Sequence, residues 1–146
     1  MSKAINMAGG GGGTKPTLLL TFIGQRASTT MDAPSVALFN NESDYFIRNP
    51  NYSDYAHYIC QKAGTYTFRL SVRSAYPASS STRTTMTARI YIGTSYGSRE
   101  LSSPSNSSSY VTAEFTVTLA VGNTIGLNAA ISSGSALCPV NLLIVQ

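Results

Sequence analysis

The 146-residue chain contains no tryptophan, and only 11% of its residues are charged. Its ten Lys and Arg residues outnumber its six acidic residues, but they are scattered, without the basic run that follows a phosphate backbone. The sequence therefore argues against a nucleic-acid-binding protein. Because Ser, Thr, Gly, Asn and Tyr are abundant in place of charges, we expect a surface of hydroxyl and amide groups, which suits an all-β protein.

Long hydrophobic runs are also absent. The longest, Leu18 to Leu20, is far shorter than the roughly 20 residues that a membrane-spanning helix requires, so no membrane insertion is expected. Residues 1–7 lack the apolar core of a signal peptide, which predicts synthesis in the cytoplasm.

Cysteine is scarce too. A cytoplasmic origin favours buried free thiols at Cys60 and Cys138, although a disulfide stays open if their strands are neighbours.

The chain has little of what an active site needs. The single histidine, His57, lies among aromatic residues and is interpreted as a packed or surface side chain. The two cysteines lack the spacing of zinc ligands. The acidic cluster at Glu42 and Asp44 lacks the glycine turn and the number of ligands that a calcium loop requires. We therefore expect a non-enzymatic protein that uses no metal ion and no cofactor.

Alternation of apolar and polar residues is the strongest pattern that the sequence does have. It is typical of strands with one buried face, and it predicts strands over residues 64–73, 85–92, 111–119 and 140–144. Residues 111–131 are predicted to form a β-hairpin, because residues that tolerate turn dihedrals, Gly122 to Thr124, separate two alternating runs. The residues of this hairpin assigned to the core are Phe115, Val117, Ile125 and Leu127.

Shorter strands are expected over residues 17–23, 45–48 and 55–60, which are rich in β-formers. The Ser-rich stretch 93–109 is predicted to be a long loop without secondary structure. No helical periodicity extends beyond about two turns. About seven to nine strands at these intervals indicate an all-β fold, an antiparallel sandwich or jelly roll.

The chain divides into two parts, a tail of residues 1–16 and a head domain of residues 17–146. The tail contains five consecutive glycines, Gly9, Gly10, Gly11, Gly12 and Gly13, whose backbone entropy is high and which have no side chain that could pack. They are not a phosphate loop, since no strand precedes them and no GK[ST] follows. Two interpretations stay open: a flexible linker, or an anchor to a partner that becomes ordered on the partner's surface.

Exposed tyrosines with small polar neighbours can form adaptable recognition surfaces. Four tyrosines lie in or beside the two Ser-rich loops at residues 75–82 and 93–109, and we take them as a possible receptor or glycan contact site: Tyr76, Tyr91, Tyr96 and Tyr110. The alternative is ordinary solvation of loop residues.

Three segments carry a resemblance to a known family. GTYTFRLSVRSA, TTMTARIYIGT and VTAEFTVTLAVGNTIGLNAAI, within residues 64–131, resemble the C-terminal half of the C1q/tumour-necrosis-factor-like jelly roll, in which a G-x-Y-x-F strand precedes further alternating strands. The turn of that family is matched here by Gly122 to Ile125. The closing segment LCPVNLLIVQ departs from the family pattern. The resemblance implies a jelly-roll head that forms a homotrimer.

The start of the chain resembles a second group. INMAGGGGG, residues 5–13, is similar to the beginnings of head-fibre, collar and tail-fibre proteins of phages that infect gut bacteria. The two resemblances together imply a bacteriophage virion structural protein whose tail binds other virion proteins and whose head serves decoration or adhesion to a host glycan or protein. The alternatives are a cellular carbohydrate-binding or C1q-like recognition module, and a subunit of a bacterial surface or injection assembly.

Overall fold

The computed structural model describes residues 16–22, 26–32, 37–40, 44–77 and 80–146. The predicted anchor glycines, Gly9 to Gly13, lie outside this part of the chain, so the structure does not test them. No helix among the described residues is long and apolar enough to cross a membrane.

The described residues form strands joined by turns and loops. The strands are β2 (Leu18–Thr21), β3 (Arg26–Ala27), β4 (Ala37–Asn40), β5 (Phe46–Arg48), β6 (His57–Cys60), β7 (Gly64–Val72), β8 (Met86–Ile92), β9 (Glu100–Ser102), β10 (Val111–Leu119), β11 (Thr124–Ile131), β12 (Ala136–Leu137) and β13 (Val140–Val145). Those expected over residues 17–23, 45–48 and 55–60 are present as β2, β5 and β6.

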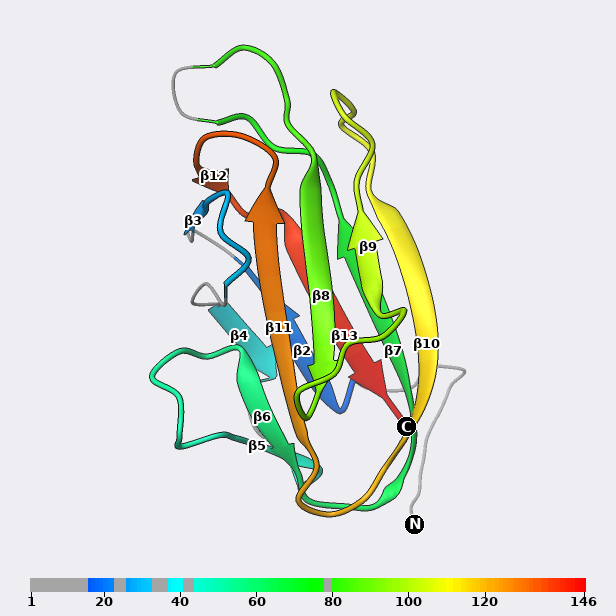
Figure 1. The fold of residues 1–146 in the computed structure, drawn as a ribbon. Helices are drawn as coiled ribbons and strands as arrows, with labels where there is room; N and C mark the ends of the chain where they lie inside the picture. Colours follow the sequence, from blue (N-terminus) through cyan, green and yellow to red (C-terminus); the bar gives the residue numbers. More distant parts are fainter. Residues whose placement is uncertain (1–15, 23–25, 33–36, 41–43, 78–79) are drawn as a thin grey trace.

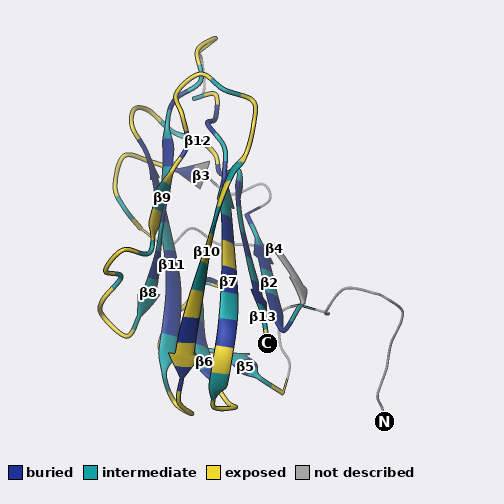
Figure 2. Ribbon diagram, turned by 90° about the vertical axis from the view of Figure 1, so that its right-hand side faces the viewer, coloured by how far each residue is buried: buried dark blue, intermediate teal, exposed yellow. Residues whose placement is uncertain are grey.

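Two antiparallel five-stranded sheets pack face to face as a jelly roll (Figures 1 and 2). The strand order is β10-β7-β13-β2-β4 in the first sheet and β5-β6-β11-β8-β9 in the second, while β12 and β3 form a small separate pair. The chain passes from one sheet to the other after β4, β6, β7, β9, β10 and β11, so strands adjacent in the sequence frequently belong to different layers. This architecture confirms the predicted all-β, antiparallel jelly-roll class.

The core lies between the sheets, where the apolar positions of the alternating strands meet (Figure 2). On β7, and on β8 as far as Ile90, buried and less buried residues alternate. The fully buried side chains are Tyr66, Phe68, Leu70, Val72, Met86, Ala88 and Ile90. Phe68 of β7 faces both Phe115 of β10 and Ile144 of β13 across the ladder, which places it in the middle of its sheet. The predicted strand registers are confirmed here.

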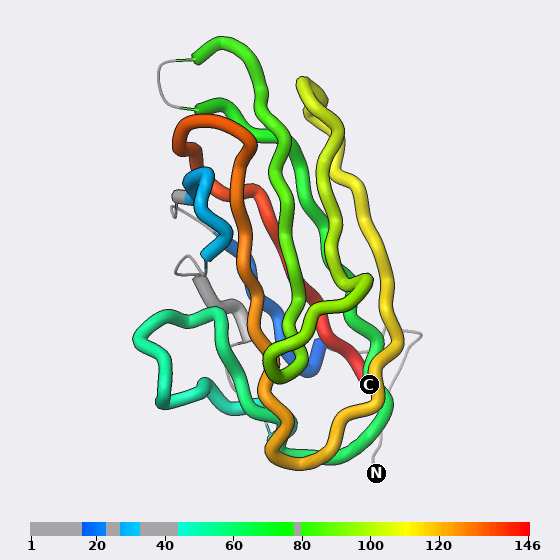
Figure 3. The backbone as a smooth tube through the Cα atoms, viewed as in Figure 1, coloured from blue at the N-terminus to red at the C-terminus, as the bar shows by residue number. Residues whose placement is uncertain are grey.

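Residues 111–131 do not form the predicted hairpin. β10 pairs with β7, whereas β11 pairs with β6 and β8 of the other sheet. The turn between β10 and β11 crosses from one sheet to the other (Figure 3). Its backbone bonds to the end of β6: the Gly122 N–H donates to the Cys60 carbonyl and the Cys60 N–H to the Asn123 carbonyl, both at 2.8 Å. Gly122, with φ of 91°, suits such a turn as well as it suits a hairpin.

Phe115 is only partly buried, contrary to its assignment to the core. β10 is the edge strand of its sheet, so Phe115 has a neighbouring strand on one side only and packs at the margin of the core. The other three residues assigned with it, Val117, Ile125 and Leu127, are buried as predicted.

Residues 93–109 are not a loop throughout, because β9 lies within them and pairs with β8. Two side-chain contacts join the strands: the Arg89 guanidinium pairs with Glu100, and the hydroxyls of Thr87 and Ser102 lie 2.7 Å apart. β9 contains only one apolar residue, Leu101, so the sequence shows no alternating run there. Sequence periodicity therefore could not detect this strand.

Both cysteines are buried and free, as predicted. The Cys60 thiol donates to the Lys62 carbonyl at 3.0 Å, and the Cys138 thiol lies 3.9 Å from the Met86 sulfur. Burial raises the pKa of Cys138 from 9.0 to about 12, so its thiol is neutral and unreactive at physiological pH.

Candidate functional site

The four predicted contact tyrosines do not form one cluster. Tyr76 and Tyr110 lie at the end of the sandwich where β7 ends and β10 begins, whereas Tyr91 and Tyr96 lie towards the opposite end, beside the end of β8 (Figure 1). Tyr91 and Tyr96 contact each other edge to face, with ring centroids 5.2 Å apart. The structure thus separates the predicted surface into two pairs, and the first pair lines a pocket.

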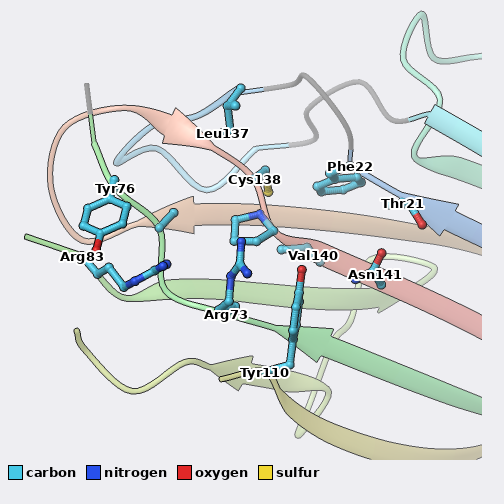
Figure 4. Close-up of a pocket in the computed structure, with 12 residues that line it drawn as sticks. Thr21, Phe22, Arg73, Tyr76, Arg83, Tyr110, Leu137, Cys138, Val140 and Asn141 are labelled. Carbon is cyan, nitrogen blue, oxygen red and sulfur yellow. The ribbon is translucent and has the colours of Figure 1, made fainter. Parts of the chain in front are cut away.

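A pocket of about 420 Å³ lies between Tyr76 and Tyr110 (Figure 4). Its walls come from the end of β2, the segment after β7, the residue before β10, and the start of β13. The lining residues are Thr21, Phe22, Arg73, Ala75, Tyr76, Arg83, Tyr110, Leu137, Cys138, Pro139, Val140 and Asn141. Strands distant in the sequence therefore meet here, because β13 lies between β7 and β2 in the sheet.

Each tyrosine of this pocket holds an arginine against its ring. The guanidinium carbon of Arg73 lies 5.0 Å from the ring centroid of Tyr110, and that of Arg83 lies 4.3 Å from the ring centroid of Tyr76. Arg83 also donates to the Ser74 carbonyl at 3.0 Å. Cation–π contacts of this kind fix the orientation of a guanidinium while leaving its donor edge available.

The pocket carries positive charge without a local counter-charge. Neither aspartate nor glutamate is among its lining residues. The carboxylates of Glu100, Glu114 and Asp54 pair elsewhere, with Arg89, Arg69 and His57 respectively. Within the described part of the chain, the buried Nε of Arg73 has no hydrogen-bond partner. Such a donor is rare, since most buried polar groups are satisfied.

The floor of the pocket is apolar. Phe22, Cys138 and Val140 are each 5% exposed or less, and Pro139 lies against them. The rim is polar and accessible, because Tyr76 and Tyr110 are 51% and 46% exposed. The arrangement suits a ligand that has an apolar or aromatic-stacking face and an anionic group.

A second pocket, of about 410 Å³, is lined by His57 and belongs to the β5-β6-β11-β8-β9 sheet. The Nδ1 of His57 lies 2.8 Å from the Asp54 carboxylate, and the ring of Tyr52 stacks on the imidazole with centroids 3.7 Å apart. The backbone of Gly126 lies close to the imidazole ring of His57, since a Cβ at residue 126 would lie 2.7 Å from the His57 Cδ2. His57 is therefore packed in place, and the described residues hold no group of three or more His, Cys, Asp or Glu that could bind a metal ion.

Sequence reasoning missed Arg73 and Arg83. As outward or loop residues of a polar chain they are indistinguishable from solvated surface arginines. One signal could have found them: they flank, on either side, the loop at residues 75–82 that carries Tyr76.

No protein-family model matches this chain, and no curated protein matches it in sequence. Solved structures do resemble it. Pika GITRL is 12% identical with a TM-score of 0.47, covering 88% of this chain and 95% of its own. Murine APRIL is 12% identical with a TM-score of 0.45, covering 88% and 97%. A family 35 carbohydrate-binding module from an environmental isolate is 17% identical with a TM-score of 0.41, covering 88% and 92%. At these identities the similarity concerns the fold alone.

Proposed function

We propose that this protein is a non-enzymatic structural component of a bacteriophage virion. In this proposal residues 1–16 attach the protein to other virion proteins, with Gly9 to Gly13 at the contact. The jelly-roll head, residues 17–146, is displayed for decoration or for adhesion to a host glycan or protein. The site of action is accordingly the virion, assembled in the host cytoplasm.

The observation that carries the proposal is where the head begins. The Thr17 N–H donates to the Ile144 carbonyl at 2.7 Å, and β2 starts at the next residue. The buried core runs from Leu18 to Ile144. The head thus has a core of its own, whose first residue, Leu18, follows the tail in the sequence, and this supports a separate role for residues 1–16.

Deletion of residues 1–13 tests the proposal. We expect the thermal midpoint of the head to stay unchanged, because the described core lies outside the deletion, while the number of copies in purified particles falls at least tenfold. A variant with Gly9 to Gly13 replaced by serine separates the two interpretations of the tail: a linker tolerates serine, and an anchor threaded through a narrow crevice does not. Full incorporation of the deletion variant would contradict the proposal.

A homotrimer is part of the same proposal. The outward face of the β10-β7-β13-β2-β4 sheet has an aliphatic centre, where Leu19, Leu143 and Val145 alternate with buried residues and are themselves half-buried. Hydroxyl side chains flank this centre, and the Arg69–Glu114 pair at its edge is electrically neutral. A face of this kind supports self-association. The C1q/TNF-like resemblance favours three copies.

Leu143→Arg tests the trimer. We expect light scattering to show three copies for the wild-type chain and one folded copy for this variant, because the arginines would meet without partners on the aliphatic face. Its thermal midpoint should be lower than that of the wild type, since loss of the trimer removes the stabilisation that association provides. Val121→Arg, at a 67% exposed turn position, is the matched control and should stay trimeric. A wild-type monomer at micromolar concentration would refute the trimer.

One observation favours the second candidate, a cellular carbohydrate-binding or C1q-like recognition module. The pocket between Arg73 and Arg83 is built as a recognition site would be, which a purely decorative head does not need. The deletion of residues 1–13 also separates these candidates, since a free-standing recognition module would keep its complete activity and its location without the tail.

A further inference from the structure

We propose that the pocket between the Arg73–Tyr110 and Arg83–Tyr76 pairs binds an acidic sugar, that is, a uronic or sialic acid residue of a glycan. The inference rests on the proposed function, because it names the class of molecule that the displayed head would contact.

The positive charges of Arg73 and Arg83 favour an anionic ligand in the pocket. Two guanidinium groups line it without any lining carboxylate, although the carboxylates of Glu114 and Glu100 each pair with an arginine elsewhere. The buried Nε of Arg73 is a donor without an acceptor among the described residues. A carboxylate can accept two parallel hydrogen bonds from one guanidinium, and the guanidinium groups of Arg73 and Arg83 are the charged donors among the lining residues.

The remaining surface of the pocket fits the body of a sugar. The tyrosine rings are half exposed at the rim, where the C–H face of a pyranose can pack. Thr21 and Asn141 supply a hydroxyl and an amide to the sugar hydroxyls, and both are lining residues (Figure 4). The volume of about 420 Å³ lies within the roughly 300–1,000 Å³ of small-ligand sites.

A nucleic acid is disfavoured by the surroundings of the pocket. A phosphate backbone needs a row of unpaired cations, but the nearest outward arginine along β7, Arg69, is paired with Glu114 at 2.6 Å. A single site with two arginines instead suits one acidic sugar residue of a glycan.

Calorimetric titration of the full chain tests the inference with two matched ligand pairs. The first is tetragalacturonate and its methyl ester, and the second is sialyllactose and its methyl ester. In each pair the skeleton is similar and only one member is anionic. We expect at least one acid to bind at least tenfold more tightly than its neutral counterpart, with an affinity that weakens as salt is added.

Arg73→Gln should lower the affinity for that acid at least tenfold. The matched control is Arg48→Gln, because Arg48 stacks on Tyr55 at 4.4 Å outside the pocket, and it should leave the affinity unchanged. The thermal midpoint of each variant is measured alongside. If Arg73→Gln is unstable, Arg83→Gln replaces it, with the same expected loss.

Four results would overturn the inference: neither acid binds, a neutral counterpart binds equally well, the arginine variants retain affinity, or inorganic phosphate or a sulfated disaccharide binds more tightly than the acids. Each result is distinct from failure of the proposed function. If the chain joins particles through its tail but binds no acidic sugar, the virion role is supported and the sugar site is refuted. If the chain binds the sugar but is absent from particles, the sugar site is supported and the virion role is refuted.

Discussion

Phe68→Ala is expected to lower the free energy of unfolding by about 3–5 kcal/mol, the cost of removing a fully buried aromatic ring from a core. Phe68 is completely buried in β7 and has paired strands on both sides. Its direct cross-strand partner, Phe115, is half-buried on the edge strand β10. Phe115→Ala should therefore cost less, no more than about 2 kcal/mol, because less apolar surface is lost from the core.

Urea unfolding of the two variants checks this difference. The pair is well matched, since both changes remove the same atoms from facing positions of one ladder. Equal losses would mean that Phe115 is as buried as Phe68, and that β10 is not an edge strand. A small loss at Phe68 would mean that the register of β7 is wrong.

The second large effect is a loss of stability at alkaline pH that depends on Cys138. Burial raises the pKa of this thiol to about 12 in the folded protein, against 9.0 for an exposed thiol. Below pH 9 both states keep the proton, and the stabilising contribution is fully present. Above pH 9 the unfolded state loses the proton first, so stability falls by about 1.4 kcal/mol at pH 10 and roughly 2.7 kcal/mol at pH 11.

Cys138→Ala isolates this contribution. The variant should be less stable than the wild type at pH 8, because it leaves a small cavity, but it should lose less stability between pH 8 and pH 10. Comparing the two proteins over that interval is preferable to working above it, since Tyr66, whose pKa burial also raises from 10.0 to about 12, adds an increasing loss of stability to both proteins above pH 10. Identical pH dependence in both proteins would contradict the burial of Cys138.

The strands of the fold were predictable wherever one face of the strand is buried and the other is exposed to solvent. Gly64–Val72 and Met86–Ile92 show this alternation, and their buried sets were identified correctly. β9 has no such signal, because three residues with one apolar side chain are too few to show a period. Its position depends instead on pairing with β8, which is a tertiary effect.

The hairpin error has a more general cause. The residues around Gly122 permit a tight reversal of the chain, and local sequence does not distinguish a reversal within one sheet from a crossing between two. The direction of the chain after this turn depends on β6, because the backbone groups of Cys60 form hydrogen bonds with Gly122 and Asn123. Sequence patterns contain no information about that distant partner.

The candidate site was predictable only in its aromatic part. Exposed tyrosines with small polar neighbours can form recognition surfaces, which predicts Tyr76 and Tyr110, and the structure brings these two to one pocket. Their use in binding stays a prediction. Arg73 and Arg83 became candidates only once the structure showed them stacked on those rings, without a lining carboxylate, because the placement of counter-charges is a property of the fold.

The central claim, that the tail attaches this protein to a phage particle, is tested most directly by cross-linking mass spectrometry of purified particles. Lysines mark the two parts of the chain: Lys3 and Lys15 belong to the tail, and Lys62 belongs to the head. We expect cross-links from Lys3 or Lys15 to a different virion protein, and none to such a protein from Lys62. Absence of the chain from particles, or attachment through Lys62 alone, would contradict the account.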